Sequence, residues 1–289
     1  MSSTLVQLRF LQPRDTYQHE KPFWLFVSKP DQAEMTNVVL ESVTDIPLHD
    51  VRGNESSYNL DQNGFQFVTH EQQFTAFDSD EQIKTDFVPQ VESLILKNIA
   101  YASKVHVFDW RIRQEMSDED LNKLISPAQI QDKSFVLAPS QTVHTDATEF
   151  TLLKHVRTHL PEEADDLLKC RIQMVNFWRP LHHEVRNWPL VVCDGRTTPI
   201  KNLIPVDQIG RRFVGDIYYA TYDSCYKWYY QSCMQAHEGI LFKSWDTGDS
   251  SESKACIHSS CRLPPEMIPE KCHPRLSIEC RALVFSPLD

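Results

Sequence analysis

The stretch Arg171-Ile172-Gln173-Met174-Val175-Asn176-Phe177-Trp178 is typical of a β-strand, and shorter runs of the same kind recur on both sides of it. Successive side chains of a strand point to opposite faces, so Asn176 and Trp178 share one face of this strand. After Ile130 we expect strands at 133–137, 141–146, 171–178, 188–193, 226–231, 239–245, 254–259 and 275–285. About eight short strands with few helices between them predict an antiparallel double sheet. The expected fold is therefore mainly β with flanking helices, around a double-stranded β-helix (jelly-roll) core.

The part of the chain before this region mixes strands with helices. Strands are expected at 1–10, 23–27, 64–68 and 104–108. Over 80–102 apolar residues recur at three- and four-residue spacing, which predicts an amphipathic helix with Asp80 as N-cap and a kink or break at Pro89. Further short helices are expected after Ser117, with Asp120 completing a weak capping box, and at 161–169. We expect one domain over 1–289, in which a mixed α/β layer of 1–130 packs on a jelly-roll core of 131–289.

Composition excludes several classes of protein. The net charge is −11 and no cluster of Lys and Arg is present, so the basic face that nucleic acid requires is missing. No apolar run is long enough for a membrane span, and no secretion signal is visible, which predicts a cytoplasmic protein without membrane contact. The seven glycines form neither a dinucleotide-binding loop nor a P-loop.

Eight cysteines raise the question of disulfides or a thiolate metal site. The chain has no Cys-x-x-Cys pair, and a protein of this size does not depend on disulfide staples. Cys256, Cys261 and Cys272 lie close enough in sequence for a zinc site to be an alternative. We expect buried, reduced thiols instead.

A different set of residues predicts a metal site. His144-Thr145-Asp146 falls at the end of an expected strand, where residues i and i+2 share a face, so both side chains can reach one ion. A third ligand, His258, comes from the expected strand 254–259. Two imidazoles and one carboxylate on one face of iron(II) leave positions open for substrate and dioxygen. We therefore expect a mononuclear non-haem iron site at His144, Asp146 and His258.

The spacing His-x-Asp is not specific by itself, and a second triplet of this kind, His182-His183-Glu184, is present. We expect that second triplet to lie in a loop. The alternative for His144 is an ordinary half-buried histidine next to a carboxylate.

Arg275-Leu276-Ser277 provides a second signal, after His258 in the chain. A guanidinium and a hydroxyl on one strand face can hold a carboxylate by charge-assisted hydrogen bonds. Arg281 lies on the same strand face and is the competing candidate for this role. Glu279 lies on that face too. An ion pair of Glu279 with the arginines on a solvent-exposed face is the alternative. The order His-x-Asp, His, Arg-x-Ser favours an oxygenase site.

The order of these elements resembles the 2-oxoglutarate/iron(II) dioxygenases. A closer resemblance, over most of the chain, is to the fungal hydroxylase/desaturase family of aspergillic-acid and gibberellin desaturase enzymes, related to bacterial cephamycin-methoxylation proteins. Its most specific run is Asn176-Phe177-Trp178-Arg179-Pro180-Leu181. The other segments that carry it are 107–109, 112–113, 189–194, 228–230, 241–246 and 277–285.

This resemblance implies iron(II) held by His144, Asp146 and His258, with 2-oxoglutarate and O2 as co-substrates. Arg275 and Ser277 match the position that binds the distal carboxylate of 2-oxoglutarate, and Asn176 is expected to make a second contact with it. The implied reaction is hydroxylation, desaturation or oxidative cyclisation of a small organic intermediate of secondary metabolism.

The chain departs from the family pattern at Ile257-His258-Ser259-Ser260, where Pro-His followed by Ala-Phe is usual. It also lacks the usual Gly and Arg after Asp146. These departures leave the metal ligands intact but put the substrate and the outcome of the reaction in doubt. Three alternatives to the implied function stay open. They are an iron-dependent oxidase that does not consume 2-oxoglutarate, a non-catalytic jelly-roll binding or accessory protein, and a metal hydrolase.

Overall fold

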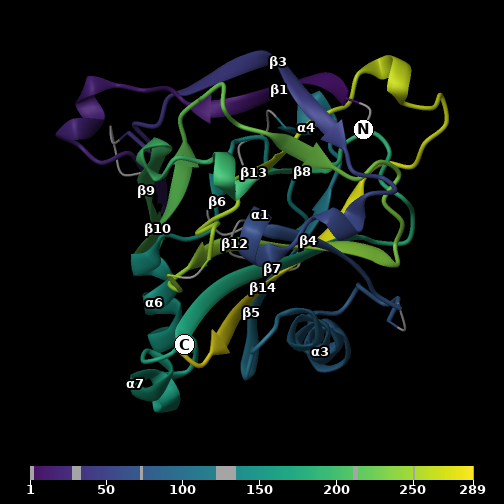
Figure 1. The fold of residues 1–289 in the computed structure, drawn as a ribbon. Helices are drawn as coiled ribbons and strands as arrows, with labels where there is room; N and C mark the ends of the chain where they lie inside the picture. The colour runs from purple at the N-terminus through teal and green to yellow at the C-terminus, as the bar shows by residue number, and fades with distance from the viewer. Residues whose placement is uncertain are drawn as a thin grey trace.

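Two β-sheets facing each other build the protein, as Figure 1 shows. The computed structural model of the chain describes residues 3–27, 34–71, 74–121, 135–210, 214–249 and 251–288. The larger sheet contains, in spatial order, β1 (Ser3–Leu11), β3 (Leu40–Asp50), β11 (Trp228–Tyr230), β8 (Leu190–Cys193), β13 (His258–Ser260), β6 (His144–Thr145), β10 (Val214–Ala220), β9 (Leu203–Gly210) and β2 (Phe23–Phe26). Two of its pairings are parallel, β11 with β3 and β2 with β9. The predicted mainly β fold with a double-sheet core is confirmed.

The smaller sheet is antiparallel throughout and contains β4 (Phe65–Thr69), β12 (Glu238–Asp246), β7 (Arg171–Pro180), β14 (Leu276–Ser286) and β5 (Lys104–Gln114). Its central strand β7 is the predicted strand 171–178. Trp178 packs with Val192 of β8 in the core between the sheets, whereas Phe177 belongs to a cluster on the outer face. The alternation read from the sequence therefore sorts the side chains of β7 correctly.

Helices flank the sheets. Those of α type are α1 (Leu60–Asn63), α2 (Asp80–Gln82), α3 (Val88–Asn98), α4 (Asp118–Leu121), α6 (Glu149–His159) and α7 (Ala164–Leu167). A π-helical turn covers Ile83–Phe87, and 3-10 turns cover Asp15–Gln18, Glu55–Ser57, Pro161–Glu163, Gly195–Thr197, Ile200–Asn202 and Pro265–Met267. α3 lies on the side of the small sheet that faces away from the large one (Figure 1). Within the described residues, no helix has the length and apolarity that crossing a bilayer requires.

The expected helix over 80–102 consists of α2, a π-helical turn and α3, and it ends at Asn98. Ser79, not Asp80, is its N-cap, because the Ser79 hydroxyl accepts a hydrogen bond from the backbone N–H of Gln82 (3.4 Å). The break expected at Pro89 takes the form of the π-helical turn before α3, and Pro89 then occupies the first turn of α3, where proline is tolerated. The N-cap expected at Ser117 is confirmed, since its hydroxyl accepts from the N–H of Asp120 (3.1 Å).

Other expectations need correction. The helix expected at 161–169 is a 3-10 turn followed by α7, which ends at Leu167. Five of the described helices and strands were not expected at all: β3, α1, α6, β9 and β10. The strand expected at 133–137 falls partly outside the described residues, and of its remainder only Leu137 forms a bridge, with Arg113.

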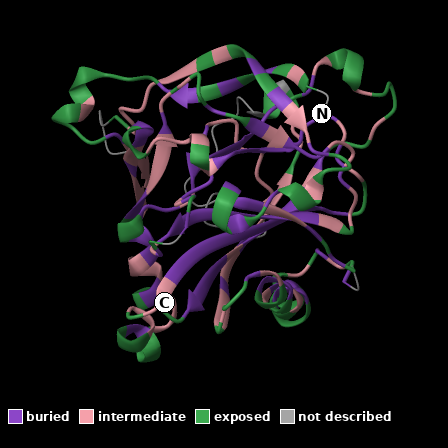
Figure 2. Cartoon of the chain, viewed as in Figure 1, coloured by how far each residue is buried: buried purple, intermediate pink, exposed green. Residues whose placement is uncertain are grey.

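Strands from the first part of the chain pair directly with later ones. β1, β2 and β3 extend the large sheet, and β4 and β5 form the edges of the small one. Arg9 of β1 also bridges to Thr142, just before β6, and the N–H of Val143 donates to the Arg9 carbonyl (2.8 Å). The division at residue 130 stays a prediction. Figure 2 shows buried residues along both sheets and exposed ones mainly on helices and connections.

Candidate metal centre

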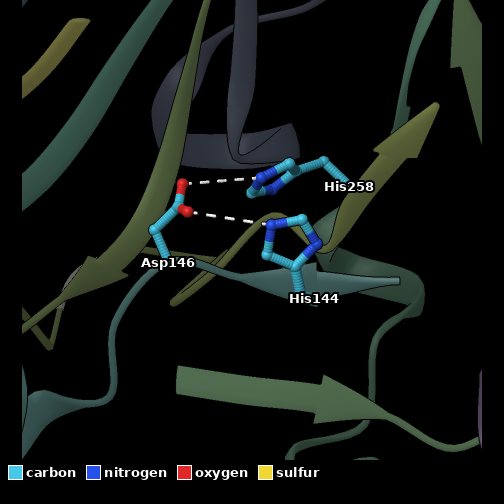
Figure 3. A group of neighbouring side chains, drawn as sticks. All are labelled: His144, Asp146 and His258. Atoms are coloured by element: carbon cyan, nitrogen blue, oxygen red, sulfur yellow. Dashed lines mark ion pairs between the residues drawn. The ribbon is translucent and has the colours of Figure 1, made fainter. Parts of the chain in front are cut away.

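Among the described residues, one group of three side chains can hold a metal ion: His144, Asp146 and His258, whose ligand atoms lie within 4.8 Å of one another (Figure 3). His144 on β6 and His258 on β13 are direct partners across the strand ladder, which brings together residues that are far apart in sequence. The Nε2 atoms of the two imidazoles lie 3.7 and 3.5 Å from the two carboxylate oxygens of Asp146. The structure therefore places all three predicted ligands around one point between the two sheets.

Backbone carbonyls orient both imidazoles. Nδ1 of His144 lies 2.7 Å from the carbonyl oxygen of Thr142, and Nδ1 of His258 lies 3.1 Å from that of Cys256. A carbonyl can only accept, so each Nδ1 carries the hydrogen and each Nε2 presents its lone pair toward Asp146. Burial, followed by the neighbouring His258, lowers the pKa of His144 and favours the neutral, metal-binding imidazole.

The carboxylate of Asp146 is held from the opposite sheet. Arg281 of β14 donates from Nη2 to Oδ1 (2.9 Å), and the side-chain amide of Asn176 on β7 donates to Oδ2. Burial alone would raise the pKa of Asp146, but the charge of Arg281 and, after it, the two neighbouring histidines hold it well below its usual value. The carboxylate is thus ionised and oriented before any ligand binds.

Arg281 has further carboxylate partners. Its Nη1 donates to Asp109 (3.1 Å) and its Nη2 to Glu279 (3.0 Å), in addition to Asp146. Glu279 does pair with Arg281, as the alternative expected. The pair does not lie on a solvent-exposed face, however, because Glu279 is only 5% exposed.

Arg275 and Ser277 have very different surroundings. Arg275 is fully buried, donates from Nε to the Ser277 hydroxyl (3.2 Å) and from Nη1 to the carbonyl of Trp188 (2.9 Å), and lies over the ring of Trp178 (5.1 Å). No carboxylate of the described residues pairs with its guanidinium. Burial, then the charge of Arg113, lowers the pKa of Arg275 to about 9. The buried Arg275 and the half-buried Arg113 thus lie near each other, and the charges of Glu279 and Glu115 offset that of Arg275 only in part, without an ion pair among the described residues.

The remaining sequence predictions for this region can be placed. The triplet of His182, His183 and Glu184 lies in the connection after β7, as predicted, and Glu184 pairs with Arg186 there. All eight cysteines are free thiols. Burial raises the pKa of Cys261 to about 12 and so favours its protonated form.

Sequence reasoning missed several residues around the centre. The ring of Phe242 lies 4.5 Å from that of His258, and Arg113 and Asp109 contribute charge from β5. Arg113 could have been found from pairing, because it is the direct partner of Ser277 across the β5–β14 ladder. By the same reasoning Asp109 is the direct partner of Arg281 in that ladder, and Phe242 is the direct partner of Asn176 across the β12–β7 ladder.

Comparisons with known proteins agree with this geometry. A family model described as an oxidoreductase/YMDC permease-like domain matches residues 8–285. The hydroxylase/desaturase efuI of Hormonema carpetanum is 31% identical over 254 residues, 83% of each chain. The Fe(II)/2-oxoglutarate-dependent dioxygenase nvfI of Aspergillus novofumigatus is 28% identical over 287 residues, 96% of this chain and 95% of that one.

A solved structure extends the similarity to three dimensions. The iron and alpha-ketoglutarate-dependent endoperoxidase NvfI superimposes with a TM-score of 0.83 at 25% identity, covering 99% of this chain and 98% of that one. The chain therefore belongs to the oxidoreductase family that contains the fungal hydroxylase/desaturases and Fe(II)/2-oxoglutarate-dependent dioxygenases.

Proposed function

We propose that His144, Asp146 and His258 hold iron(II) in this chain, and that Arg275 with Ser277 binds the distal carboxylate of 2-oxoglutarate. The enzyme class, an Fe(II)/2-oxoglutarate-dependent oxidoreductase, follows from the family. The observation that carries the residue assignment is the common orientation of the two Nε2 lone pairs and the Asp146 carboxylate (Figure 3). Two imidazoles and one carboxylate are a ligand set that suits iron(II) and leaves positions open.

The second half of the proposal rests on unbalanced charge. A buried guanidinium without an anionic partner is costly, and the carboxylate of a ligand would offset that cost at Arg275. Arg281 is the weaker candidate because three carboxylates already accept its hydrogen bonds. For Asn176 we propose that Nδ2 orients Asp146 and leaves Oδ1 for a ligand.

When bound, iron(II) with 2-oxoglutarate and O2 supplies the oxidising power for hydroxylation, desaturation or ring closure. The chain contributes three ligands, an arginine clamp and a buried site. Asn176 and Arg281 keep Asp146 ionised and correctly turned, and the carbonyls of Thr142 and Cys256 fix the two imidazoles.

We further propose a small organic intermediate of secondary metabolism as substrate, and the cytoplasm as location. Relatives named hydroxylase/desaturase and endoperoxidase support the substrate class. The acidic net charge of −11 disfavours nucleic acid, and eight free thiols agree with a reducing compartment.

Anaerobic addition of iron(II) and then 2-oxoglutarate, followed by visible spectroscopy, tests the proposal. We expect a weak charge-transfer band in the green that requires both components and is missing in His258→Ala. Absence of the band in the wild type would favour a non-catalytic protein or a hydrolase. Formation of the band without succinate release during substrate turnover would indicate an oxidase that does not consume 2-oxoglutarate.

A further inference from the structure

Arg179 is a second buried arginine, and it lies on the other face of β7. Its side chain is fully buried, yet of its guanidinium nitrogens only Nη1 has a hydrogen-bond acceptor, the carbonyl of Ala236 (2.9 Å). Nε and Nη2 have no partner among the described residues. Trp178, the preceding residue of the strand, faces the space between the sheets, so Arg179 faces away from the metal centre.

Aromatic rings surround the Arg179 guanidinium. Its central carbon lies 5.3 Å from the ring centre of Phe77 and 5.1 Å from that of Phe87, and Phe74 packs edge-on against Phe77 (5.1 Å). Phe74 and Phe77 are 9% and 7% exposed, so side chains that reach the surface cover the guanidinium. Cation–π contacts stabilise such a charge only in part and satisfy none of its N–H groups.

His70 adds a third unpaired polar atom at the same place. Its backbone N–H donates to the carbonyl of His237 (2.7 Å), next to the Ala236 carbonyl that accepts from Arg179. Nδ1 of His70 is buried and has no partner among the described residues. Burial, then the charge of Arg179, lowers the pKa of His70, which keeps the imidazole neutral and able to donate one hydrogen bond.

The identity of the unpaired atoms indicates the ligand class. Nε and Nη2 form the edge of a guanidinium that binds both oxygens of a carboxylate in parallel. One positive charge beside a neutral imidazole matches a monoanion, and the phenylalanine rings match an apolar body. We infer that Arg179, with His70, forms a binding site for an apolar monocarboxylate on the outer face of β7, separate from the metal centre.

Calorimetric titration of the full chain with phenylacetate tests this inference, with 2-phenylacetamide as the uncharged control. We expect saturable one-to-one binding of phenylacetate only, of equal strength with and without saturating iron(II) and 2-oxoglutarate. Arg179→Met should abolish binding of phenylacetate. Arg179→Lys keeps the positive charge but cannot donate two parallel hydrogen bonds, so it should weaken binding about tenfold or more. Arg275→Met, which removes the buried arginine of the opposite face, should leave it unchanged.

Three results of the calorimetric titration would overturn the inference. One is the absence of saturable binding to the wild type, and another is equal binding of the acid and the amide. The third is binding that survives Arg179→Lys but is lost in Arg275→Met or on addition of 2-oxoglutarate, because the carboxylate would then occupy the metal-side site. If Arg179→Met does not fold, Arg179→Lys and the Nε–H NMR signal of Arg179 during wild-type titration decide the question. An unmoved signal at saturation contradicts the site.

Discussion

Asn176 and Arg281 are direct partners across the β7–β14 ladder, and each donates a hydrogen bond to a different oxygen of the same carboxylate, Asp146. Both belong to the small sheet, whereas Asp146 follows β6 of the large sheet. One carboxylate thus ties the two sheets together beside the two histidines. Outer contacts of this kind orient a metal ligand and tune its affinity.

Asn176→Ala should therefore weaken iron(II) binding about tenfold to a hundredfold, because Asp146 loses one of the two groups that turn it toward the histidines. Anaerobic titration with iron(II) measures the affinity, and the melting temperature reports on the fold. Asn63→Ala is a matched control, since Asn63 is another buried asparagine that donates to a carboxylate, that of Asp194 (3.0 Å). If both variants bind iron(II) like the wild type, Asn176 does not position the ligand.

His144→Ala, Asp146→Ala and His258→Ala should each abolish retention of iron(II) without unfolding the chain, because each removes one of three ligands. Bound iron per chain and the thermal unfolding curve are the measurements. His183→Ala should keep its iron, since His183 stacks on His273 (3.8 Å) in the connection after β7. Normal iron content in the His258 variant would show that the ligand set is wrong.

A buried ion cluster predicts how stability depends on pH. Asp246 is fully buried and accepts from Arg171 (2.7 Å) and Lys243 (2.9 Å). Burial would raise the pKa of Asp246, but these two cations hold it at about 2. Its pKa in the unfolded chain is about 3.9, so its stabilising contribution is complete above that value and is lost as the pH falls toward 2.

Asp246→Asn should accordingly reduce the free energy of unfolding near pH 7 by about 3–5 kcal/mol, because it leaves the buried Lys243 without the carboxylate that accepts its hydrogen bond. Urea unfolding at pH 7, 4 and 3 measures the effect, and the difference from the wild type should shrink at the lowest pH. Asp166→Asn breaks the exposed pair with Lys169 and should change nothing measurable. A constant difference at all three pH values would contradict the role of ionised Asp246.

How far the sequence predicted the fold depends on whether local pattern and burial agree. The strand 171–178 became β7 because its alternation matches its two buried faces. α6 was missed because its buried residues, Thr151, Leu152 and Val156, form a narrow stripe, while Phe150 points to solvent and is 66% exposed. β9 contains Pro205 and β10 contains Gly215, residues that usually mark turns.

Contacts within the metal site that depend on strand pairing could not be predicted from the sequence either. The His-x-Asp spacing could predict two neighbouring ligands, since it depends only on alternation within one strand. The pairing of His144 with His258 depends on strand register, and the contact of Asn176 with Asp146 depends on how two sheets face each other. Neither is encoded in any local pattern. The family resemblance singled out Asn176 as a contact of 2-oxoglutarate. In the structure the side-chain amide of Asn176 donates a hydrogen bond to Asp146.

Arg275→Met should raise the dissociation constant of 2-oxoglutarate by about one to two orders of magnitude, and more than Arg281→Met does. The reason is the difference in their partners. Arg281 already donates to Asp109, Asp146 and Glu279, whereas no carboxylate of the described residues pairs with Arg275. A ligand carboxylate therefore replaces nothing at Arg275, but at Arg281 it would have to displace an existing ion pair.

The measurement is an anaerobic titration of 2-oxoglutarate, followed by its visible band, at iron(II) concentrations that saturate each variant. Saturation is needed because Arg281→Met also loosens Asp146, and weak iron binding would imitate weak 2-oxoglutarate binding. Arg262→Met is a matched control, since Arg262 stacks on Trp188 (4.7 Å) and is exposed to solvent, whereas buried Arg275 donates to the carbonyl of that same tryptophan. A larger loss in Arg281→Met than in Arg275→Met would move the clamp to Arg281, and the charge of Arg275 would then need another explanation.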